Sequence, residues 1–304
     1  MQTYKYVKVL PLISQIVKIK NMVDFAFLDS GTGGIPYLER LLEIQPDVSC
    51  VYVGDTANFP YGEKTHEEIV KCVLEIAKKI IDRFSPKVFI VACNTMSVNA
   101  LDVLREVFPS TDFVGTVPAI KLASSVSKKR RIGLLATEST VENPYNVDLK
   151  NHFASDCELV LRSDPELISF IEHESFTATK EECIKAIMPA INFFYEKDCD
   201  TIILGCTHFL NLAELFQETA DNVSGRTIQI VDSREGVTNR ALSIFNSLNQ
   251  SSTGSDSKDA TIDSKILHGQ KKSRLYVTGL SKAKDRNEYD VICNRYHLEW
   301  GGII

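Results

Sequence analysis

The sequence predicts an α/β protein built from two similar, doubly wound, parallel-sheet domains. Short apolar segments alternate with amphipathic stretches along most of the chain, and strands that are apolar on both faces are typical of parallel sheets. Two of these segments end alike, in a cysteine followed by polar residues, which indicates that one half of the fold resembles the other. The length of 304 residues also fits about two domains.

Nine segments have the length and composition of buried strands. They cover residues 25–28, 50–53, 88–92, 113–115, 132–135, 159–161, 201–204, 228–231 and 275–277. Most of them are followed at once by Gly, Asp, Cys or Thr, which are typical of loops and helix starts. Strands that alternate with helices in this way pair in parallel through right-handed crossovers.

The stretches between these strands have the spacing of amphipathic helices, most clearly at residues 67–84, 97–107 and 180–195. A further, polar helix is expected after residue 277. By contrast, residues 247–274 are rich in Ser, Lys, Asp and Gly and hold few apolar side chains. This composition predicts a solvated linker, with a regulatory tail as the alternative.

Composition excludes several classes of protein. The net charge of −6 argues against binding to nucleic acid, because such proteins usually present a basic surface. No segment approaches the ~20 apolar residues of a membrane span, and residues 1–20 lack the continuous apolar core of a secretory signal. The eight cysteines form no CxxC pair, so free thiols in a reducing compartment are expected. A cytoplasmic protein without a nucleic-acid or membrane partner is therefore predicted.

Two matched elements place a cysteine at the end of a buried strand. Cys93 follows the strand at 88–92, and Cys206 follows the strand at 201–204. In open α/β sheets, ligands bind beyond the carboxyl ends of the strands, so both thiols are expected to face one cleft. A helix that begins after each cysteine would favour its reactive thiolate form. One such cysteine alone could be a small core side chain, but two in matched surroundings favour chemistry.

The Gly-rich turn at residues 29–34 is expected at the same edge of the sheet. It matches neither a P-loop nor a GxGxxG motif, but its backbone N–H groups could bind a carboxylate. Asp29 could orient a thiol or exchange a proton with it. His208, two residues after Cys206, could deprotonate that thiol or stabilise its thiolate. One Cys and one His do not make the four-ligand set of a zinc site, so no metal is expected.

Four segments together resemble the aspartate/glutamate racemase superfamily, and within it most closely the members that act on glutamate. They are FLDSGTGG at 27–34, VGDTANFPYG at 53–62, ACNT at 92–95 and LGCTH at 204–208. Their order and spacing fit from about residue 23 to the C-terminus, and LYVT at 275–278 is similar to the last strand of that family. Residues 1–21 lie outside this pattern and form an extension.

The resemblance implies roles for individual residues. Cys93 and Cys206 would be the catalytic acid/base pair, with Asp29 assisting the first thiol and His208 the second. Glu172, in the segment IEHE at 171–174, would also assist the second thiol. The substrate contacts implied are Asp29, Ser30, Tyr61, Gly62, Asn94, Thr95, Thr140, Thr207 and His208.

The resemblance also implies two doubly wound domains with the active site in the cleft between them. The first would comprise residues 22–116 and 231–304, and the second residues 117–230. The implied reaction inverts Cα of glutamate: one thiolate removes its proton, and the opposite thiol returns one. It would supply D-glutamate for peptidoglycan. No cofactor is expected, because no motif for pyridoxal phosphate is present. The implied partners are free glutamate and, as one option, a second copy of the chain.

Two alternatives stay open on the sequence alone. An aspartate racemase, or another two-Cys racemase of the superfamily, would share both cysteines. The segments PYG at 60–62 and CTH at 206–208 favour glutamate over these. The second alternative is a non-catalytic α/β protein that binds a small ligand, but binding alone requires no pair of thiols.

Overall fold

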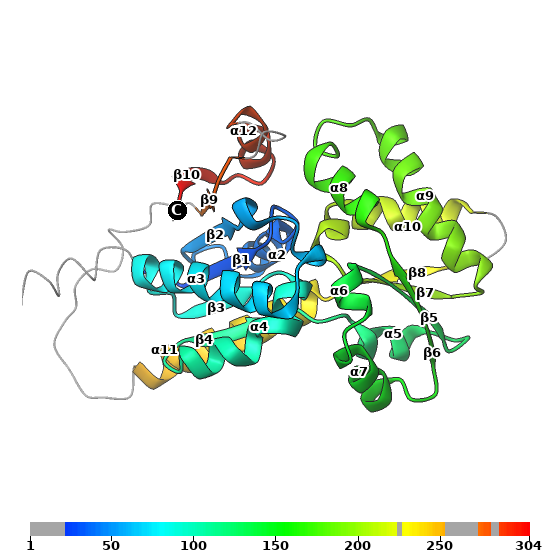
Figure 1. Ribbon diagram of the computed structural model, residues 1–304, viewed down its shortest axis with the longest axis horizontal. Coiled ribbons are helices and arrows are strands. Elements are labelled where there is room, and N and C mark those ends of the chain that lie inside the picture. The colour runs from blue at the N-terminus through cyan, green and yellow to red at the C-terminus, as the bar shows by residue number, and fades with distance from the viewer. Residues whose placement is uncertain (1–21, 224–226, 253–272, 281–285) are drawn as a thin grey trace, which may run out of the picture.

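The computed structural model describes residues 22–223, 227–252, 273–280 and 286–304. The strands of the first sheet are β1 (Phe25–Asp29), β2 (Cys50–Gly54), β3 (Val88–Val91), β4 (Asp112–Gly115), β9 (Arg274–Val277) and β10 (Glu299–Ile303). Those of the second are β5 (Arg131–Ala136), β6 (Glu158–Ser163), β7 (Thr201–Leu204) and β8 (Gln229–Val231). The spatial orders are β10-β9-β2-β1-β3-β4 and β6-β5-β7-β8, and the paired strands are parallel. The two sheets and their helices form two lobes (Figure 1).

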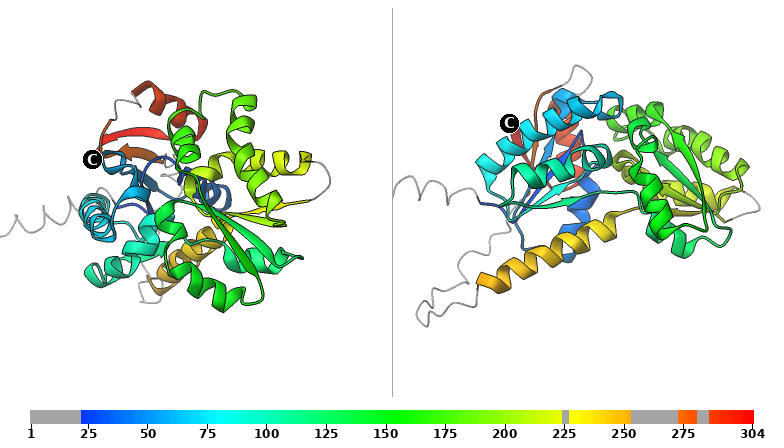
Figure 2. Two further views of the ribbon diagram at one scale, coloured as in Figure 1. Left: turned by 45° about the vertical axis from the view of Figure 1, so that its right-hand side comes forward. Right: turned by 60° about the horizontal axis from the view of Figure 1, so that its bottom comes forward.

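Helices cover both faces of the first sheet. One face packs against α2 (Ile35–Ile44) and α11 (Arg234–Ser252), and the other against α3 (His66–Phe84) and α4 (Asn94–Val107). Alternate side chains of a strand point to opposite faces, so Phe27 joins the first core and Leu28 the second. Figure 2 shows α11 running along the first sheet after the chain leaves the second.

The second sheet is covered in the same way. On one face lie α5 (Ile120–Val126) and α7 (Tyr145–Phe153), and on the other α8 (Pro165–His173), α9 (Lys180–Glu196) and α10 (Ala213–Asn222). The short α6 (Glu138–Val141) follows β5, and α12 (Arg286–Arg295) precedes β10. The predicted fold class, with two doubly wound parallel sheets, is therefore confirmed.

Two of the longer helices begin at capping boxes that the sequence supplies. Thr65 and Glu68 form a capping box at the start of α3, and Thr179 and Glu182 form another at the start of α9. Helix α4 begins at residue 94, three residues earlier than predicted, with Cys93 at the N-cap position.

The segment after the second cysteine differs from the prediction. Cys206 is followed by the 3₁₀ helix η3 (Thr207–Leu212), which leads into α10, so only the first thiol stands at the start of an α-helix. Strand β10 was not predicted, because its sequence EWGGI lacks the continuous apolar pattern of a buried strand.

The observed strands and helices differ from two predicted limits, that of the second domain and that of the polar linker. Val231 still pairs with Ile203 in the second sheet, one position beyond the limit predicted for the second domain. The domain limits themselves stay a prediction. The linker predicted at 247–274 starts too early, since α11 continues to Ser252. Residues 253–272 of this linker, and the extension at 1–21, lie outside the described residues.

Every described helix is too short or too polar to cross a lipid bilayer.

Candidate active site

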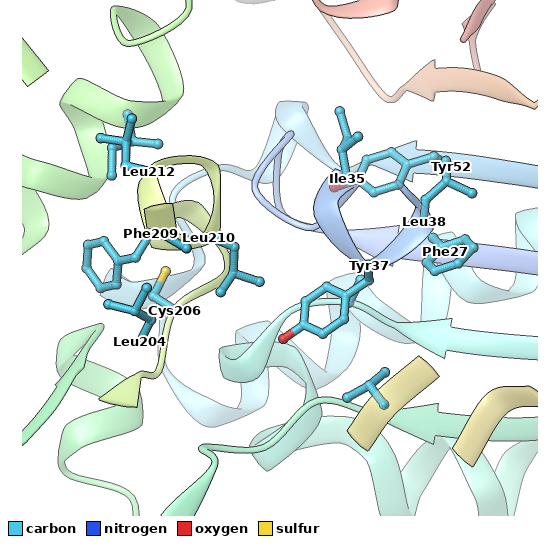
Figure 3. Packing of buried hydrophobic residues seen from close by; sticks show 14 of the residues in the cluster. Phe27, Ile35, Tyr37, Leu38, Tyr52, Leu204, Cys206, Phe209, Leu210 and Leu212 are labelled. Atoms are coloured by element: carbon cyan, nitrogen blue, oxygen red, sulfur yellow. The ribbon is translucent and has the colours of Figure 1, made fainter. Parts of the chain in front are cut away.

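The carboxyl ends of strands from both sheets meet at a cavity of about 560 Å³. Cys93 follows β3 of the first sheet and Cys206 follows β7 of the second, and both line this cavity. Each side chain is only 5% exposed. Figure 3 shows Cys206 beside Leu204 and Phe209 in the apolar core. The tertiary structure therefore brings the two matched cysteines to one site.

Hydrogen bonds tie the residues next to each cysteine to the opposite half of the fold. Asn94, directly after Cys93, donates from Nδ2 to the carbonyl oxygen of Gly205, directly before Cys206. In the opposite direction, Thr207 Oγ1 donates to Asp29 Oδ2 over 3.0 Å. Because each bond joins one sheet to the other, the relative placement of the thiols depends on both halves of the fold.

Cys206 belongs to a buried row of three polar side chains. Its Sγ lies 3.5 Å from Nδ1 of His208, and Nε2 of the same ring lies 3.2 Å from Oε2 of Glu172. Burial opposes a charged imidazole, but the neighbouring Cys206 and Glu172 outweigh it and raise the pKa of His208 well above its ordinary value. His208 is therefore suited to hold a proton between the sulfur and the carboxylate.

Cys93 has different surroundings. Its thiol donates to Ser30 Oγ over 3.8 Å, and burial together with the nearby Asp29 charge raises the pKa of Cys93 well above its usual range. Asp29 is fully buried, and burial raises its pKa to about 6, although the His208 charge and the Gly31 N–H oppose the shift. Both groups thus resist ionisation, and a negative charge on one disfavours a negative charge on the other.

The Gly-rich turn is shaped by the close approach of the second half. A Cβ on Gly31 would lie 2.8 Å from Oε1 of Glu172, and a Cβ on Gly33 would lie 2.7 Å from the backbone nitrogen of His208. Glycine at both positions lets the turn pack against the residues that surround Cys206.

Three threonine hydroxyls connect the halves at another wall. Oγ1 of Thr137 lies 2.9 Å from Oγ1 of Thr95 and donates to Oγ1 of Thr140 over 2.9 Å. Thr137 lines the cavity, whereas Thr140 is fully buried behind it. The structure therefore does not place Thr140, implied by resemblance as a substrate contact, on the cavity wall.

Tyr61 and Gly62 are held at the cavity by a buried carboxylate. Asp55 Oδ2 accepts a hydrogen bond from the Tyr61 hydroxyl over 2.5 Å, and Oδ1 accepts one from Thr278 Oγ1 over 2.6 Å. Asp55 is fully buried, and these bonds connect the ends of β2 and β9 to the cavity wall.

Nine of the residues implied by the resemblance line the cavity: Ser30, Tyr61, Gly62, Cys93, Asn94, Thr95, Glu172, Cys206 and His208. Asp29, Thr140 and Thr207 lie just behind it and contact lining residues or their neighbours. The roles of all twelve stay predictions.

Sequence reasoning missed several residues of the wall: Thr56, Phe59, Pro60, Glu63, Thr137, Glu138, Pro165, Ile168, Ser169, His173 and Tyr289. Thr137 could have been found, because it directly follows β5 and so stands at the same edge of its sheet as the cysteines do. Tyr289 lies on α12, and no motif marks it. Within the described ranges, no three His, Cys, Asp or Glu side chains are grouped so that they could hold a metal ion.

Asp29→Asn is expected to flatten the pH dependence of stability. The folded-state pKa of Asp29 is about 6, against 3.8 for the ordinary carboxyl. The raised pKa adds roughly 3 kcal/mol to the free energy of unfolding below about pH 4, and this contribution is lost as pH rises through 6. Asparagine cannot ionise, so urea unfolding at pH 4, 6 and 8 should show a smaller decline than the parent protein does. Asp112→Asn, at an exposed carboxyl on β4, is the control. An unchanged decline in Asp29→Asn would contradict this prediction.

The chain is similar in sequence to a known protein family and to proteins within it. Residues 36–237 match the model of a family described as Asp/Glu/Hydantoin racemase. The chain is 34% identical over 285 residues to a protein named glutamate racemase from Treponema pallidum strain Nichols. These aligned residues cover 94% of this chain and 98% of the relative. It is 38% identical over 202 residues to one from Bartonella quintana, covering 66% and 75% of the two chains.

The fold is similar to that of a solved structure. The crystal structure of Escherichia coli glutamate racemase, in complex with L-glutamate and the activator UDP-MurNAc-ala, superposes with a TM-score of 0.73. The sequences are 26% identical, and the similarity covers 93% of this chain and 98% of the other.

Proposed function

The chain belongs to the Asp/Glu/hydantoin racemase family and interconverts the enantiomers of glutamate, and we propose that Cys93 and Cys206 do this as two opposed acid/base groups. The observation that carries this assignment is the position of both thiols on one cavity, each at the carboxyl end of a strand from a different sheet. Two bases on opposite faces of Cα can invert it without turning the substrate over.

In the L-to-D direction, Cys206 removes the Cα proton and Cys93 returns one to the other face. His208 Nδ1, 3.5 Å from the sulfur, stabilises the Cys206 thiolate that starts this step. The raised pKa of Cys93, caused by burial and by Asp29, keeps its thiol protonated and therefore able to donate. After one turnover Cys206 carries the proton and Cys93 is the thiolate.

In the D-to-L direction the roles exchange, and Cys93 must first lose its proton. Asp29 stands beside it with a pKa of about 6, so the carboxyl can hold a proton near neutral pH. A protonated Asp29 no longer repels the Cys93 thiolate, and in this way Asp29 and Cys93 share one negative charge. The ammonium group of the substrate would further favour that charge.

The cavity wall offers groups to hold the amino acid. Asn94 Oδ1 is buried and has no hydrogen-bond partner among the described residues, and as an acceptor it suits the ammonium group. The hydroxyls of Thr95 and Thr137 and the backbone around Gly62 suit the carboxylates. Donors at the α-carboxylate also stabilise the negative charge that develops when Cα loses its proton.

Polarimetry tests the proposed function. The purified protein should convert each enantiomer of glutamate into the racemate without added cofactor, and it should act far more slowly on L- and D-aspartate. Iodoacetamide should abolish turnover, and glutamate should slow that loss. Full activity after both Cys93 and Cys206 are alkylated, as verified by mass spectrometry, would overturn the assignment of the thiols.

The chemistry of the product suggests the wider role. We propose that the D-glutamate formed enters peptidoglycan. A cytoplasmic location and a homodimer stay predictions from the sequence.

A further inference from the structure

Thr32 makes two contacts that the proposed mechanism does not use. It lies in the Gly-rich turn after β1 and is fully buried. Its hydroxyl donates to Oε2 of Glu172 over 2.7 Å, and its backbone N–H donates to the same oxygen over 3.1 Å. Nε2 of His208 lies 3.2 Å from that oxygen too. Three polar groups therefore converge on one carboxylate oxygen.

These contacts join the two halves of the molecule. Thr32 lies in the turn that follows β1 of the first sheet, whereas Glu172 lies near the end of α8, beside the second sheet. Gly31 leaves the space for the carboxylate, since a Cβ there would lie 2.8 Å from Oε1. The turn thus determines where Glu172 can lie and which of its oxygens faces His208.

We propose that Thr32 is a positioning residue, which keeps Glu172 charged and directed at His208 and thereby sets how readily Cys206 gives up its proton. Thr32 is not among the residues that line the cavity, so it acts through Glu172 rather than on the substrate. Its effect on turnover rests on the proposed function, but its effect on Cys206 can be measured without turnover.

The physical reason lies in how a buried carboxylate is stabilised. Hydrogen bonds donated to the ionised form favour that form, and bonds to a charged group are stronger than neutral ones. An ionised Glu172 favours the protonated imidazole of His208, which carries one hydrogen on Nε2, toward the carboxylate, and one on Nδ1, toward Cys206. Losing the Thr32 hydroxyl removes one hydrogen bond from the Glu172 carboxylate and so weakens the support that His208 gives to a negative charge on Cys206.

Other titratable groups also face Glu172 and His208. They come from several elements and are Asp29 at the end of β1, Tyr52 on β2, Cys206 after β7 and Tyr289 on α12, together with His173, which is next to Glu172 in the sequence of α8. A substitution at Thr32 leaves all five in place, so a change in pH dependence can be assigned to the lost hydroxyl.

The test compares Thr32→Val, which removes the hydroxyl but keeps the size and the backbone N–H, with Thr32→Ser, which keeps the hydroxyl. Alkylation of Cys206 by iodoacetamide is followed against pH by mass spectrometry of its peptide. In Thr32→Val, the pH of half-maximal alkylation should rise by about one unit, and kcat/KM for glutamate should fall about tenfold with KM within about twofold. Thr32→Ser should stay close to the parent protein. Thr219→Val, at a buried threonine on α10, is a control and should change neither quantity.

A double-variant cycle separates this role from a general structural one. If Thr32 acts through Glu172, Thr32→Val should cause no further loss in a Glu172→Gln background. The proposal would be overturned by equal losses of kcat/KM in Thr32→Val and Thr32→Ser, or by additive losses of kcat/KM in the double-variant cycle. An unchanged alkylation profile of Cys206 in Thr32→Val would overturn it as well. Thr32→Ala, which adds no atoms, replaces the Val variant if the latter unfolds at the assay temperature. If the parent protein alkylates as expected but does not interconvert glutamate, the proposed function fails while the alkylation series still decides the role of Thr32.

Discussion

Cys93→Ala and Cys206→Ala are each expected to lower kcat/KM for glutamate about 10³- to 10⁴-fold, the upper part of the range that one acid/base group contributes. Each inversion needs one group that removes a proton and another that returns one, so loss of either thiol blocks both directions. The enantiomers are equally stable in water, and the equilibrium constant is therefore one. It follows that kcat/KM must fall by the same factor from L- and from D-glutamate, even though the two thiols have different surroundings.

Two measurements check this expectation. Circular dichroism gives both kcat/KM values for each variant, with Cys157→Ala, at a buried cysteine outside the cavity, as the matched control. In D₂O, early product from the parent protein should carry deuterium at Cα, while unreacted substrate should keep its hydrogen. Substantial racemisation by either Ala variant, or efficient transfer of the substrate's own hydrogen into product, would disprove the two-base assignment.

His208→Asn is expected to have the next largest effect. Cys206 loses the imidazole 3.5 Å from its sulfur, so kcat/KM should fall about 100- to 1,000-fold. Stability should fall as well, by about 3–5 kcal/mol, because Glu172 keeps a buried charge but loses the cation 3.2 Å away. Cys206 and Glu172 raise the pKa of His208 against the effect of burial. The charged His208 therefore stabilises the folded state fully below about pH 6.5, and this stabilisation is lost as pH rises through the raised pKa. The stability difference should therefore shrink at alkaline pH.

A second substitution distinguishes chemistry from stability. In His208→Asn with Glu172→Gln, no charge stays buried at this position, so urea unfolding should show much of the lost stability restored. Activity should stay low, because the imidazole is still absent. Recovery of both stability and kcat/KM in the double variant would mean that His208 only offsets the charge of Glu172 and does not act on Cys206.

Much of the architecture could be predicted from local patterns. The buried parallel strands follow from apolar segments, and the edge that carries the site follows from the residues at their carboxyl ends. On this basis the sequence predicts Cys93 and Cys206 in one cleft, and the structure has both on the same cavity. The predictions failed where the local pattern is weak: in β10, with two glycines, and after Cys206, where a 3₁₀ helix replaces the expected α-helix start.

What only the tertiary structure decided is which groups meet across the two halves. No spacing in the sequence indicates that Thr32 bonds to Glu172, that Asn94 reaches the carbonyl of Gly205, or that Tyr289 from α12 closes part of the wall. Nor does the motif at 137–141 reveal that Thr140 lies behind Thr137. The physical reason is that periodicity and turn chemistry act over a few residues and set which faces are buried, whereas these contacts depend on how the surfaces of the two halves pack. The sequence by itself determined nine of the ten strands of the described residues, the edge that carries the site and the two thiols, and the packing of the two sheets decided how each thiol is held and charged.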